Sequence, residues 1–521
     1  MNYIQLVLKN DQEIDELFAD DKENIKESDN LINEGNENIK TEFLLQSEIQ
    51  NTKVTQSINN EEEEKTNESD ENLKLVKPEY RNFISKTFGP IEAGSIRGSI
   101  FNMVILSLGS GILSIPKYIQ KTSLGMAIFL IFGIGILVWW SLLLISKVCE
   151  KNNNYNYSKL IKDLYGKCFS YIYDGLVIIF SIGILILNQV IILTLIGEAL
   201  FNLYYYKKYN NDLNEFKKDP NFWGSTFCRF ILPFIIGICI IYPLCLIKDV
   251  SKLRIVSLFG ILTLLSLILL LVIETKSYIN YYSQKTYQKD NEDTHYNFYK
   301  FQKGFDSDLT FFQYCSSLFY AYCTTIGAVP IFNTLKNHVR RRMYKVVRRS
   351  IITNMLIFTI AATAGYFTWP IQTPDLIIQR KKITTGPDYF MSIGRIALSL
   401  TIIMKLPSNY AALRIVIFDK IWGTTEISDG KNIILTFIII NFCCFISVLY
   451  VEISAYIKIL GGVCSTLVGF LFPALLIVRT NNRPRWHWKN IATILIFGGL
   501  TLIGFISSGK TVYDIVKKKK K

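Results

Sequence analysis

Long apolar runs alternate with short polar loops from residue 98 to residue 508. An α-helix needs roughly 20 mainly apolar residues to cross a bilayer, and the runs are about that long. We expect spans at 98–119, 124–148, 172–203, 228–247, 253–274, 309–333, 350–370, 389–418, 432–452, 455–478 and 490–508. No run shows the period of two that is typical of a strand. The pattern therefore predicts an all-α polytopic membrane protein with about 11 transmembrane helices.

The first 95 residues have a different composition: they are rich in Asn, Glu, Asp and Lys and include the acidic run Glu61–Glu64. Such a segment buries too little apolar surface to offset the entropy of ordering it. We predict a disordered acidic tail at 1–95, a membrane domain at 96–508 and a short basic tail at 509–521. The acidic run is interpreted as a solvated spacer, with a regulatory or partner-binding tail as the alternative.

Lys and Arg gather in the loops after spans two, four, six and ten, which share one side if eleven spans are counted. The loop after span six holds the densest group: Lys336, Arg340, Arg341, Arg342, Lys345, Arg348 and Arg349. Short cytosolic loops carry such an excess of bases, so the N-terminus is predicted to be cytosolic. The net charge of +14 follows from this topology, and no nucleic-acid-binding motif accompanies it. An odd number of spans places Lys517–Lys521 on the other side, against the rule.

The sequence lacks the residue sets that an enzyme would need. The three histidines, His295, His338 and His487, fall in predicted loops. Most of the ten cysteines fall inside apolar runs, and no paired CxxC motifs have the spacing of a metal site. There is no Ser/His/Asp set and no nucleotide-binding loop. We predict a protein that is not an enzyme and that needs no metal or cofactor.

Two of the predicted spans contain helix breakers at matching places. Span one holds Ser107–Gly111 followed by Pro116, and span six holds Cys323–Gly327 followed by Pro330. Glycines and small polar residues weaken a helix in the middle of an apolar run. Because the two breaks lie five spans apart, the sequence predicts two five-helix repeats of opposite orientation, with one helix added at the end.

Unwinding at these breaks would leave backbone N–H and C=O groups without partners near the middle of the membrane. A zwitterionic amino acid could supply those partners, because its carboxylate suits helix N-termini and its ammonium suits free carbonyls. The alternative is that the small residues only let neighbouring helices approach closely. Two matching breaks favour the binding site.

The residues around these breaks resemble the amino acid/auxin permease family, whose members have a LeuT-type fold. The stretch GSIRGSIFNMVILSLGSGILSIPKYIQKTSLGMAI is similar to the family's first-span signature, and VPIFNTLKN, AATAGYFTW and LGGVCSTLVGFLFPALL match later parts. Span eight has Arg395, Pro407 and Arg414 at the family's spacing. The resemblance covers roughly residues 94 to 508, and the order of these motifs carries it.

The resemblance implies a LeuT-type 5+5 inverted repeat plus one extra helix, and transport of amino acids across the membrane by alternating access. It implies that the substrate is bound by Ser107, Leu108, Gly109, Ser110, Gly111, Thr324, Thr325 and Gly327. The partners expected are a small amino acid and the lipid bilayer, in the plasma membrane or in an acidic vacuole. The alternative is a membrane amino acid sensor that signals to a partner through the N-terminal tail.

The family's cation position uses backbone atoms of span one and hydroxyls of span eight, for which Ser399 and Thr401 are candidates. Lys405 departs from this pattern, since it stands where a hydroxyl is expected. A charged residue within a span is costly and usually functional. Its ammonium could replace a sodium ion, which predicts proton-coupled or facilitative transport. The alternative is a lysine that extends to the interface.

Two further polar residues are candidates for ion coupling. Glu198, in TLIGEALF, is interpreted either as a proton acceptor or as a helix-end residue that faces water. Asn102 is expected to form hydrogen bonds between helices, with ion binding as the second interpretation.

Overall fold

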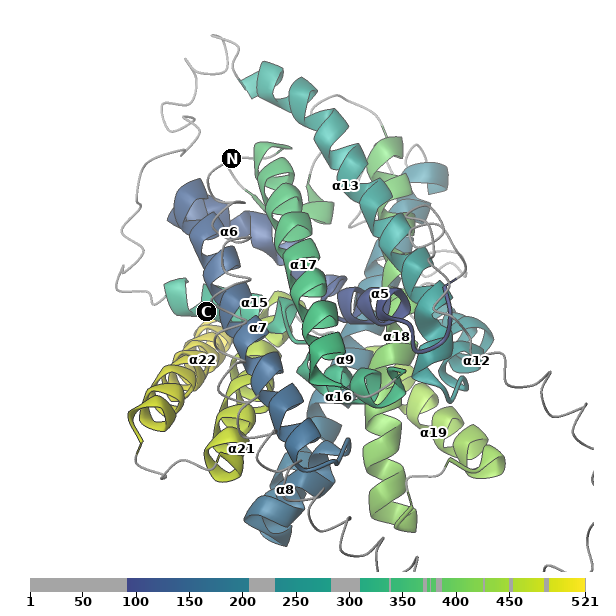
Figure 1. Cartoon of the computed structure of the whole chain (residues 1–521). Helices are drawn as coiled ribbons and strands as arrows, with labels where there is room; N and C mark the ends of the chain where they lie inside the picture. Colours follow the sequence, from purple (N-terminus) through teal and green to yellow (C-terminus); the bar gives the residue numbers. More distant parts are fainter. Residues whose placement is uncertain are drawn as a thin grey trace, which may run out of the picture. The chain divides into compact units, whose positions relative to one another are not determined.

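The computed structural model describes residues 91–205, 230–282, 310–336, 339–368, 373–374, 376–380, 387–424, 427–448, 453–481 and 487–520 (Figure 1). Of the predicted N-terminal tail, only residues 91–95 are among them, so the prediction of disorder lies outside the described residues. The chain divides into two units, residues 1–89 and residues 90–521, and all the described residues belong to the second unit.

The second unit is built from helices throughout its described residues. In chain order they are α5 (Ile96–Ser107), η1 (Ser110–Ser114), α6 (Ile115–Thr122), α7 (Leu124–Lys151), α8 (Tyr157–Tyr165), α9 (Lys167–Leu200), η2 (Phe201–Tyr205), α11 (Leu232–Ile236), η4 (Gly237–Ile241), α12 (Tyr242–Cys245), η5 (Val250–Leu253), α13 (Arg254–Tyr282), α15 (Thr310–Ala321), α16 (Thr325–Thr334), α17 (Arg340–Thr368), η6 (Ile377–Gln379), α18 (Tyr389–Trp422), α19 (Asp429–Ser447), α20 (Ile453–Ile459), η7 (Leu460–Ser465), η8 (Leu467–Leu471), α21 (Phe472–Thr480) and α22 (Trp488–Lys520).

These helices account for the eleven predicted spans. Within the described residues, 9 helices are long and apolar enough to cross a membrane, and a pair bent by 45°, 96–107 and 110–119, gives a tenth. A shorter apolar helix, Leu232–Cys245, lies where span four is predicted. The prediction of an all-helical polytopic protein is confirmed. The last helix, α22, continues to Lys520 and so covers most of the segment that the sequence separates as a basic tail.

The first and sixth spans are the ones that break. The first consists of α5, η1 and α6, with Leu108 and Gly109 between α5 and η1. The sixth consists of α15 and α16, separated by Tyr322–Thr324. Both breaks occur where the 5+5 arrangement predicts them. α8 lies beside the C-terminal end of α18, and η6 contacts the N-terminal part of α18 through Arg395. We call these two sides of the unit the α8 face and the η6 face.

The longest helices, α9 and α18, lie side by side and form the centre of the unit. Their central side chains, such as Leu187 and Leu398, are fully buried. The peripheral helices α13, α19 and α22 instead expose large apolar side chains, including Phe259, Phe445 and Leu495. Exposed apolar surface on that scale suits contact with lipid tails, as expected for membrane-spanning helices.

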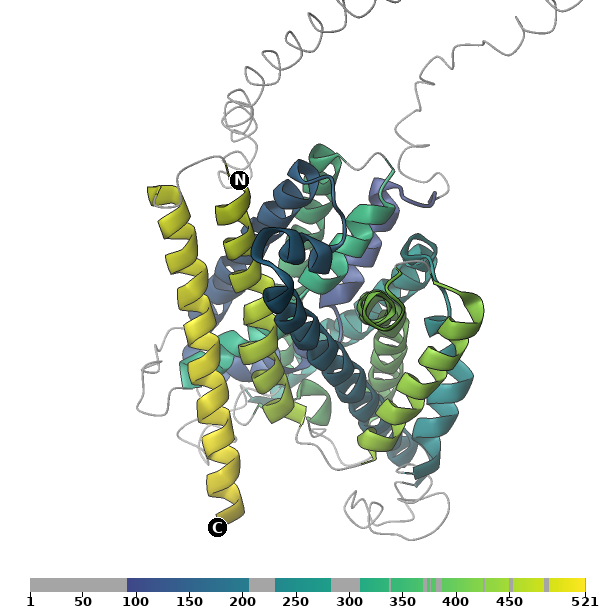
Figure 2. The same cartoon turned by 90° about the horizontal axis from the view of Figure 1, so that it is seen from below.

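The eleventh span is attached to the first ten through two glycines. A Cβ atom at Gly504 of α22 would lie within contact distance of the carbonyl oxygen of Gly462 in η7, and the reverse is also true. Ser507 forms a hydrogen bond with Ser316 of α15. Small residues let membrane helices approach closely in this way. Figure 2 shows α22, in yellow, at the edge of the bundle.

We predict that Gly504→Ala destabilises the protein because its added methyl group meets the backbone of Gly462. The expected cost is about 1–3 kcal/mol, the usual range for overpacking. The matched control is Gly498→Ala in the same helix, where an added Cβ meets nothing within 4 Å. Thermal unfolding of the purified protein in detergent measures both. Equal melting temperatures for the two variants would contradict the close contact.

Candidate functional site

The break in the first span depends on one backbone conformation that only glycine adopts easily. Leu108 is extended, with φ −75° and ψ 145°, and Gly109 has φ 133° and ψ −131°. A positive φ of this size is strained for any residue with a side chain. The α-helix therefore stops at Ser107, and a short 3₁₀ helix begins at Ser110. The backbone of Leu108 and Gly109 lies outside both helices, as the sequence predicts.

The break in the sixth span contains Thr324, which precedes the first turn of α16. Its side chain is 1% exposed, and its hydroxyl has no hydrogen-bond partner within the part of the chain that the structure describes. The next residue, Thr325, has its hydroxyl 3.5 Å from where a Cβ of Gly469 would lie. The unpartnered hydroxyl of Thr324 and the N-terminal turn of α16 are therefore available to a ligand at this level.

The two broken spans cross each other through two glycines. A Cβ at Gly111 would lie 2.7 Å from Cα of Ala321, and one at Gly327 would overlap the side chain of Leu106. Both glycines thus serve the close packing that the sequence offered as its alternative. Gly109 differs because its own backbone angle, rather than a neighbour, demands glycine.

A buried polar cluster joins the first break to its surroundings. The hydroxyl of Ser110 donates to Oδ1 of Asn188 in α9 at 3.1 Å and lies 3.0 Å from the hydroxyl of Tyr320 in α15. Asn188 is fully buried, and its Nδ2 has no partner among the described residues. Because unsatisfied buried donors are rare, this amide is a further candidate for substrate binding. The sequence prediction missed Asn188, although an amide inside an apolar span was the available signal.

Lys405 of α18 reaches the first break. Its Nζ lies 3.6 Å, and its Cδ 3.3 Å, from the position of a Cβ on Gly109, and the residue is 5% exposed. The ammonium is therefore buried beside the break in the first span.

Ser399 and Thr401, the other candidates in α18, have their hydroxyls engaged elsewhere. Ser399 donates to the carbonyl of Arg395 at 2.8 Å, and Thr401 donates to the carbonyl of Ala397 at 3.1 Å. The Thr401 hydroxyl also lies 2.9 Å from that of Thr263. Unlike Lys405, neither is placed by a measured contact at the break in the first span.

Asn102 and Glu198 both lie in contacts between segments distant in the sequence. Asn102 donates to the carbonyl of Val250 at 2.8 Å and accepts a hydrogen bond from Ser257 at 2.9 Å. Glu198 pairs with Arg395 at 3.2 Å, and both side chains are 6% exposed. Both ends of the Asn102 amide are thus used between helices, and Glu198 is not exposed to water as a helix-end residue would be.

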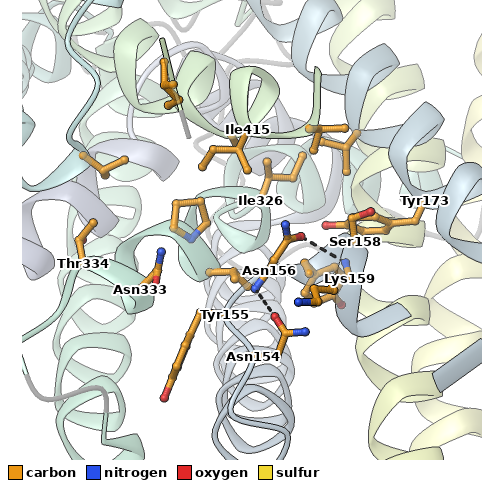
Figure 3. Close-up of a pocket in the computed structure, with 18 of the residues that line it drawn as sticks. Asn154, Tyr155, Asn156, Ser158, Lys159, Tyr173, Ile326, Asn333, Thr334 and Ile415 are labelled. Carbon is orange, nitrogen blue, oxygen red and sulfur yellow. Dashed lines mark hydrogen bonds between the residues drawn. The ribbon is translucent and has the colours of Figure 1, made fainter. Parts of the chain in front are cut away.

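A cavity of about 710 Å³ approaches the second break from the α8 face. Its rim is polar and includes Asn154 and Asn156 of the loop before α8, which are joined by a hydrogen bond (Figure 3). Its inner wall is apolar and includes Ile326 of α16 and Ile415 of α18. Ile326 is the lining residue nearest to the second break, and none of the predicted binding residues lines the cavity.

Two buried arginines hold the η6 segment against its neighbouring helices. Arg395 of α18 donates to the carbonyl of Ile378 in η6 at 2.8 Å, and its charge is paired with Glu198. Arg380, next to η6, pairs with Glu274 of α13, and its guanidinium lies 4.3 Å from the ring centre of Tyr278. These contacts hold the η6 segment against α13 and α18. The structure thus has a cavity at the α8 face, whereas ion pairs and hydrogen bonds close the η6 face.

We predict that Gly109→Val reduces uptake of radiolabelled amino acids by reconstituted protein at least about tenfold. A side chain at this φ costs about 1–3 kcal/mol, and the added atoms meet Lys405. The control is Gly133→Val in α7, where an added Cβ has no neighbour within 4 Å. Full activity of Gly109→Val would show that the break does not need this conformation.

We predict that Arg380→Gln loosens the η6 segment, because Glu274 loses its charged partner. The reporter is Ile377→Cys, a position that is 3% exposed, and the measurement is its labelling rate with a membrane-impermeant thiol reagent. Labelling should become several times faster in Arg380→Gln than in the reporter alone. Lys276→Gln, an exposed change on the same helix as Glu274, should leave the rate unchanged. Equal rates in all three proteins would exclude a fastening role.

Comparison with known proteins agrees with this geometry. Residues 92–513 match the family described as transmembrane amino acid transporter protein. The chain is 22% identical over 488 residues to a Plasmodium falciparum protein named as amino acid transporter AAT1, covering 84% of this chain and 74% of that one. It is 21% identical over 411 residues to a rat protein named as sodium-coupled neutral amino acid transporter 11, covering 78% and 83%.

Among solved structures, the crystal structure of MhsT in complex with L-phenylalanine is similar, with a TM-score of 0.47 and 16% identity over 79% of this chain and 98% of that one. The family match alone covers more than four fifths of the sequence and includes every predicted span. The protein is therefore an amino acid transporter and not an enzyme, and the chain belongs to the transmembrane amino acid transporter family.

Proposed function

We propose that this transporter moves amino acids without sodium, by proton-coupled or facilitative alternating access, with Lys405 in place of a coupling cation. One observation carries the proposal: the buried Lys405 ammonium lies beside Gly109, at the break in the first span. A fixed ammonium at this place supplies the positive charge that a bound cation would supply. Ser399 and Thr401 donate to carbonyls of their own helix, and no measured contact places either of them beside the break in the first span.

The substrate is proposed to bind between the two breaks. Its carboxylate would accept hydrogen bonds from backbone N–H groups of Gly109–Gly111 and from Nδ2 of Asn188. Its ammonium would meet the hydroxyl of Thr324, which has no partner among the described residues. Each of these protein groups is polar and buried, so a zwitterion can replace the hydration that it loses there.

Access is proposed to alternate by movement of one helix group against another. The broken spans, α7 and α17 would rock against α9, the fourth span (Leu232–Cys245), α18 and α19. The α8 face is assigned to the cytosol, because the basic cluster Arg340–Arg349 begins α17 at this face. The cavity beside Ile326 then opens to the cytosol. The membrane in question would be the plasma membrane or that of an acidic vacuole.

Glu198 is proposed to couple protons to this movement. Protonation of its carboxylate would cancel the ion pair with Arg395, which also donates to the carbonyl of Ile378. Protons arriving at the η6 face would thereby weaken the contact that keeps this face closed. The proposal requires Glu198→Gln to lose pH-driven uptake while retaining exchange of amino acids between the two sides.

The sensor interpretation is not favoured, since the relatives above are named as transporters. A regulatory partner of the N-terminal tail remains a proposal that rests on the tail's acidic sequence alone. Deletion of residues 1–89 separates the two roles, because a transporter domain should retain uptake without them.

The proposal is tested by uptake of an amino acid panel into proteoliposomes with proton and sodium gradients imposed separately. We predict saturable uptake that is driven by a proton gradient or by neither ion, and that does not respond to sodium. Lys405→Thr should reduce uptake and make the remainder respond to sodium, because a hydroxyl replaces the ammonium beside the break. Sodium-driven uptake by the unmodified protein would disprove the role of Lys405, while absence of any uptake would disprove transport itself.

A further inference from the structure

The middle of the membrane domain carries a positive charge without a negative partner. Lys405 is 5% exposed, and no carboxylate in the described ranges lies within ion-pair distance of its ammonium. The polar side chains at the neighbouring break, Ser110, Asn188 and Tyr320, are all uncharged. Whatever binds between the breaks therefore meets one unbalanced cation.

The acids of the neighbouring helix α9 are distant and already paired. Asp174 pairs with Lys420 at 2.6 Å near the α8 face, and Glu198 pairs with Arg395 at 3.2 Å near the η6 face. At 1.5 Å per residue they lie about 20 Å and about 15 Å along the helix from Asn188. Neither carboxylate can neutralise a charge at the level of the breaks.

A second buried cation, Arg414, lies nearer to the α8 face than Lys405. Arg414 of α18 is 1% exposed and donates to the backbone carbonyls of Cys245, Ile247 and Lys248 at 2.9–3.0 Å. These carbonyls leave its full charge in place, and its Nε has no partner among the described residues. Arg414 does not line the cavity, whose charged side chains are two lysines and two aspartates, Lys159, Lys248, Asp163 and Asp249. The lining of the cavity is therefore balanced in charge, and the selection depends on Lys405.

We propose that this transporter rejects amino acids with a cationic side chain, and that Lys405 sets this selection. The inference rests on the proposed binding between the breaks and names the substrate class: neutral amino acids, with acidic ones tolerated. Two unit charges about 8 Å apart at an effective dielectric constant near 20 repel each other enough to weaken binding about 30-fold. A neutral side chain of the same shape meets no such penalty.

The experiment compares pairs of competitors that differ in charge but little in shape. Citrulline is set against arginine, and norleucine against lysine, as inhibitors of uptake of a radiolabelled neutral amino acid into proteoliposomes. For the unmodified full-length protein, the neutral member of each pair should inhibit at least about tenfold more strongly. The measured quantity is the ratio of the inhibition constants of the two members of a pair, and not the rate of uptake.

Lys405→Met tests the residue itself, because methionine keeps much of the side-chain volume and removes the charge. The ratio between neutral and cationic members should fall towards one in this variant. Lys431→Met, an exposed lysine at the start of α19, should keep the original ratio. If Lys405→Met no longer transports, the same pairs are compared by the thermal stabilisation that each gives to the purified variant.

The outcomes separate this inference from the transport proposal. Absence of uptake of every amino acid would overturn the proposed function. Uptake with equal inhibition by arginine and citrulline would overturn the charge selection and leave transport in place. Selection against arginine that persists in Lys405→Met would show that another group sets it, and would overturn the role of Lys405.

Discussion

The structure is organised around backbone groups that the membrane would otherwise leave unsatisfied. A spanning helix pairs its own N–H and C=O groups, and the first and sixth spans give up part of that pairing at their breaks. The cost is kept local, since Gly109 alone takes the unusual backbone angle and Gly111 packs directly on Ala321. The polar neighbours Asn188 and Thr324 each retain a group without a partner. A zwitterionic amino acid can complete the hydrogen bonding of all these groups.

Buried cations lie at three levels of the membrane domain, between its η6 face and its α8 face. Near the η6 face, Arg380 and Arg395 have carboxylate partners and hold the η6 segment in place. Towards the α8 face, Arg414 is satisfied by backbone carbonyls and joins α18 to the segment after α12. Lys405, between these levels, has neither kind of partner in the described residues. A buried charge is costly unless it has partners, so the paired arginines hold helices together at two levels. At the third level, the charge of Lys405 stays available to a ligand.

Closure at one face and a cavity at the other follow from these contacts. The η6 face is held by ion pairs, and the hydroxyls of Ser110 and Tyr320 meet above the break. At the α8 face, the polar loop around Asn154 and Asn156 lines the mouth of the cavity. Opening the η6 face requires these buried ion pairs to part. A carboxylate that accepts a proton is the simplest chemical means of weakening them.

The sequence by itself determined the class of the protein. Span length, the base-rich loops and the two breaks five spans apart are local properties of the chain, so they predicted an all-helical transporter and the positions of its broken spans. Sequence could not distinguish Gly109, which needs its backbone angle, from Gly111 and Gly327, which need space beside Ala321 and Leu106. Tertiary structure also decided the partners of buried polar groups, because a pair such as Glu198 and Arg395 is joined only when α9 and α18 pack together.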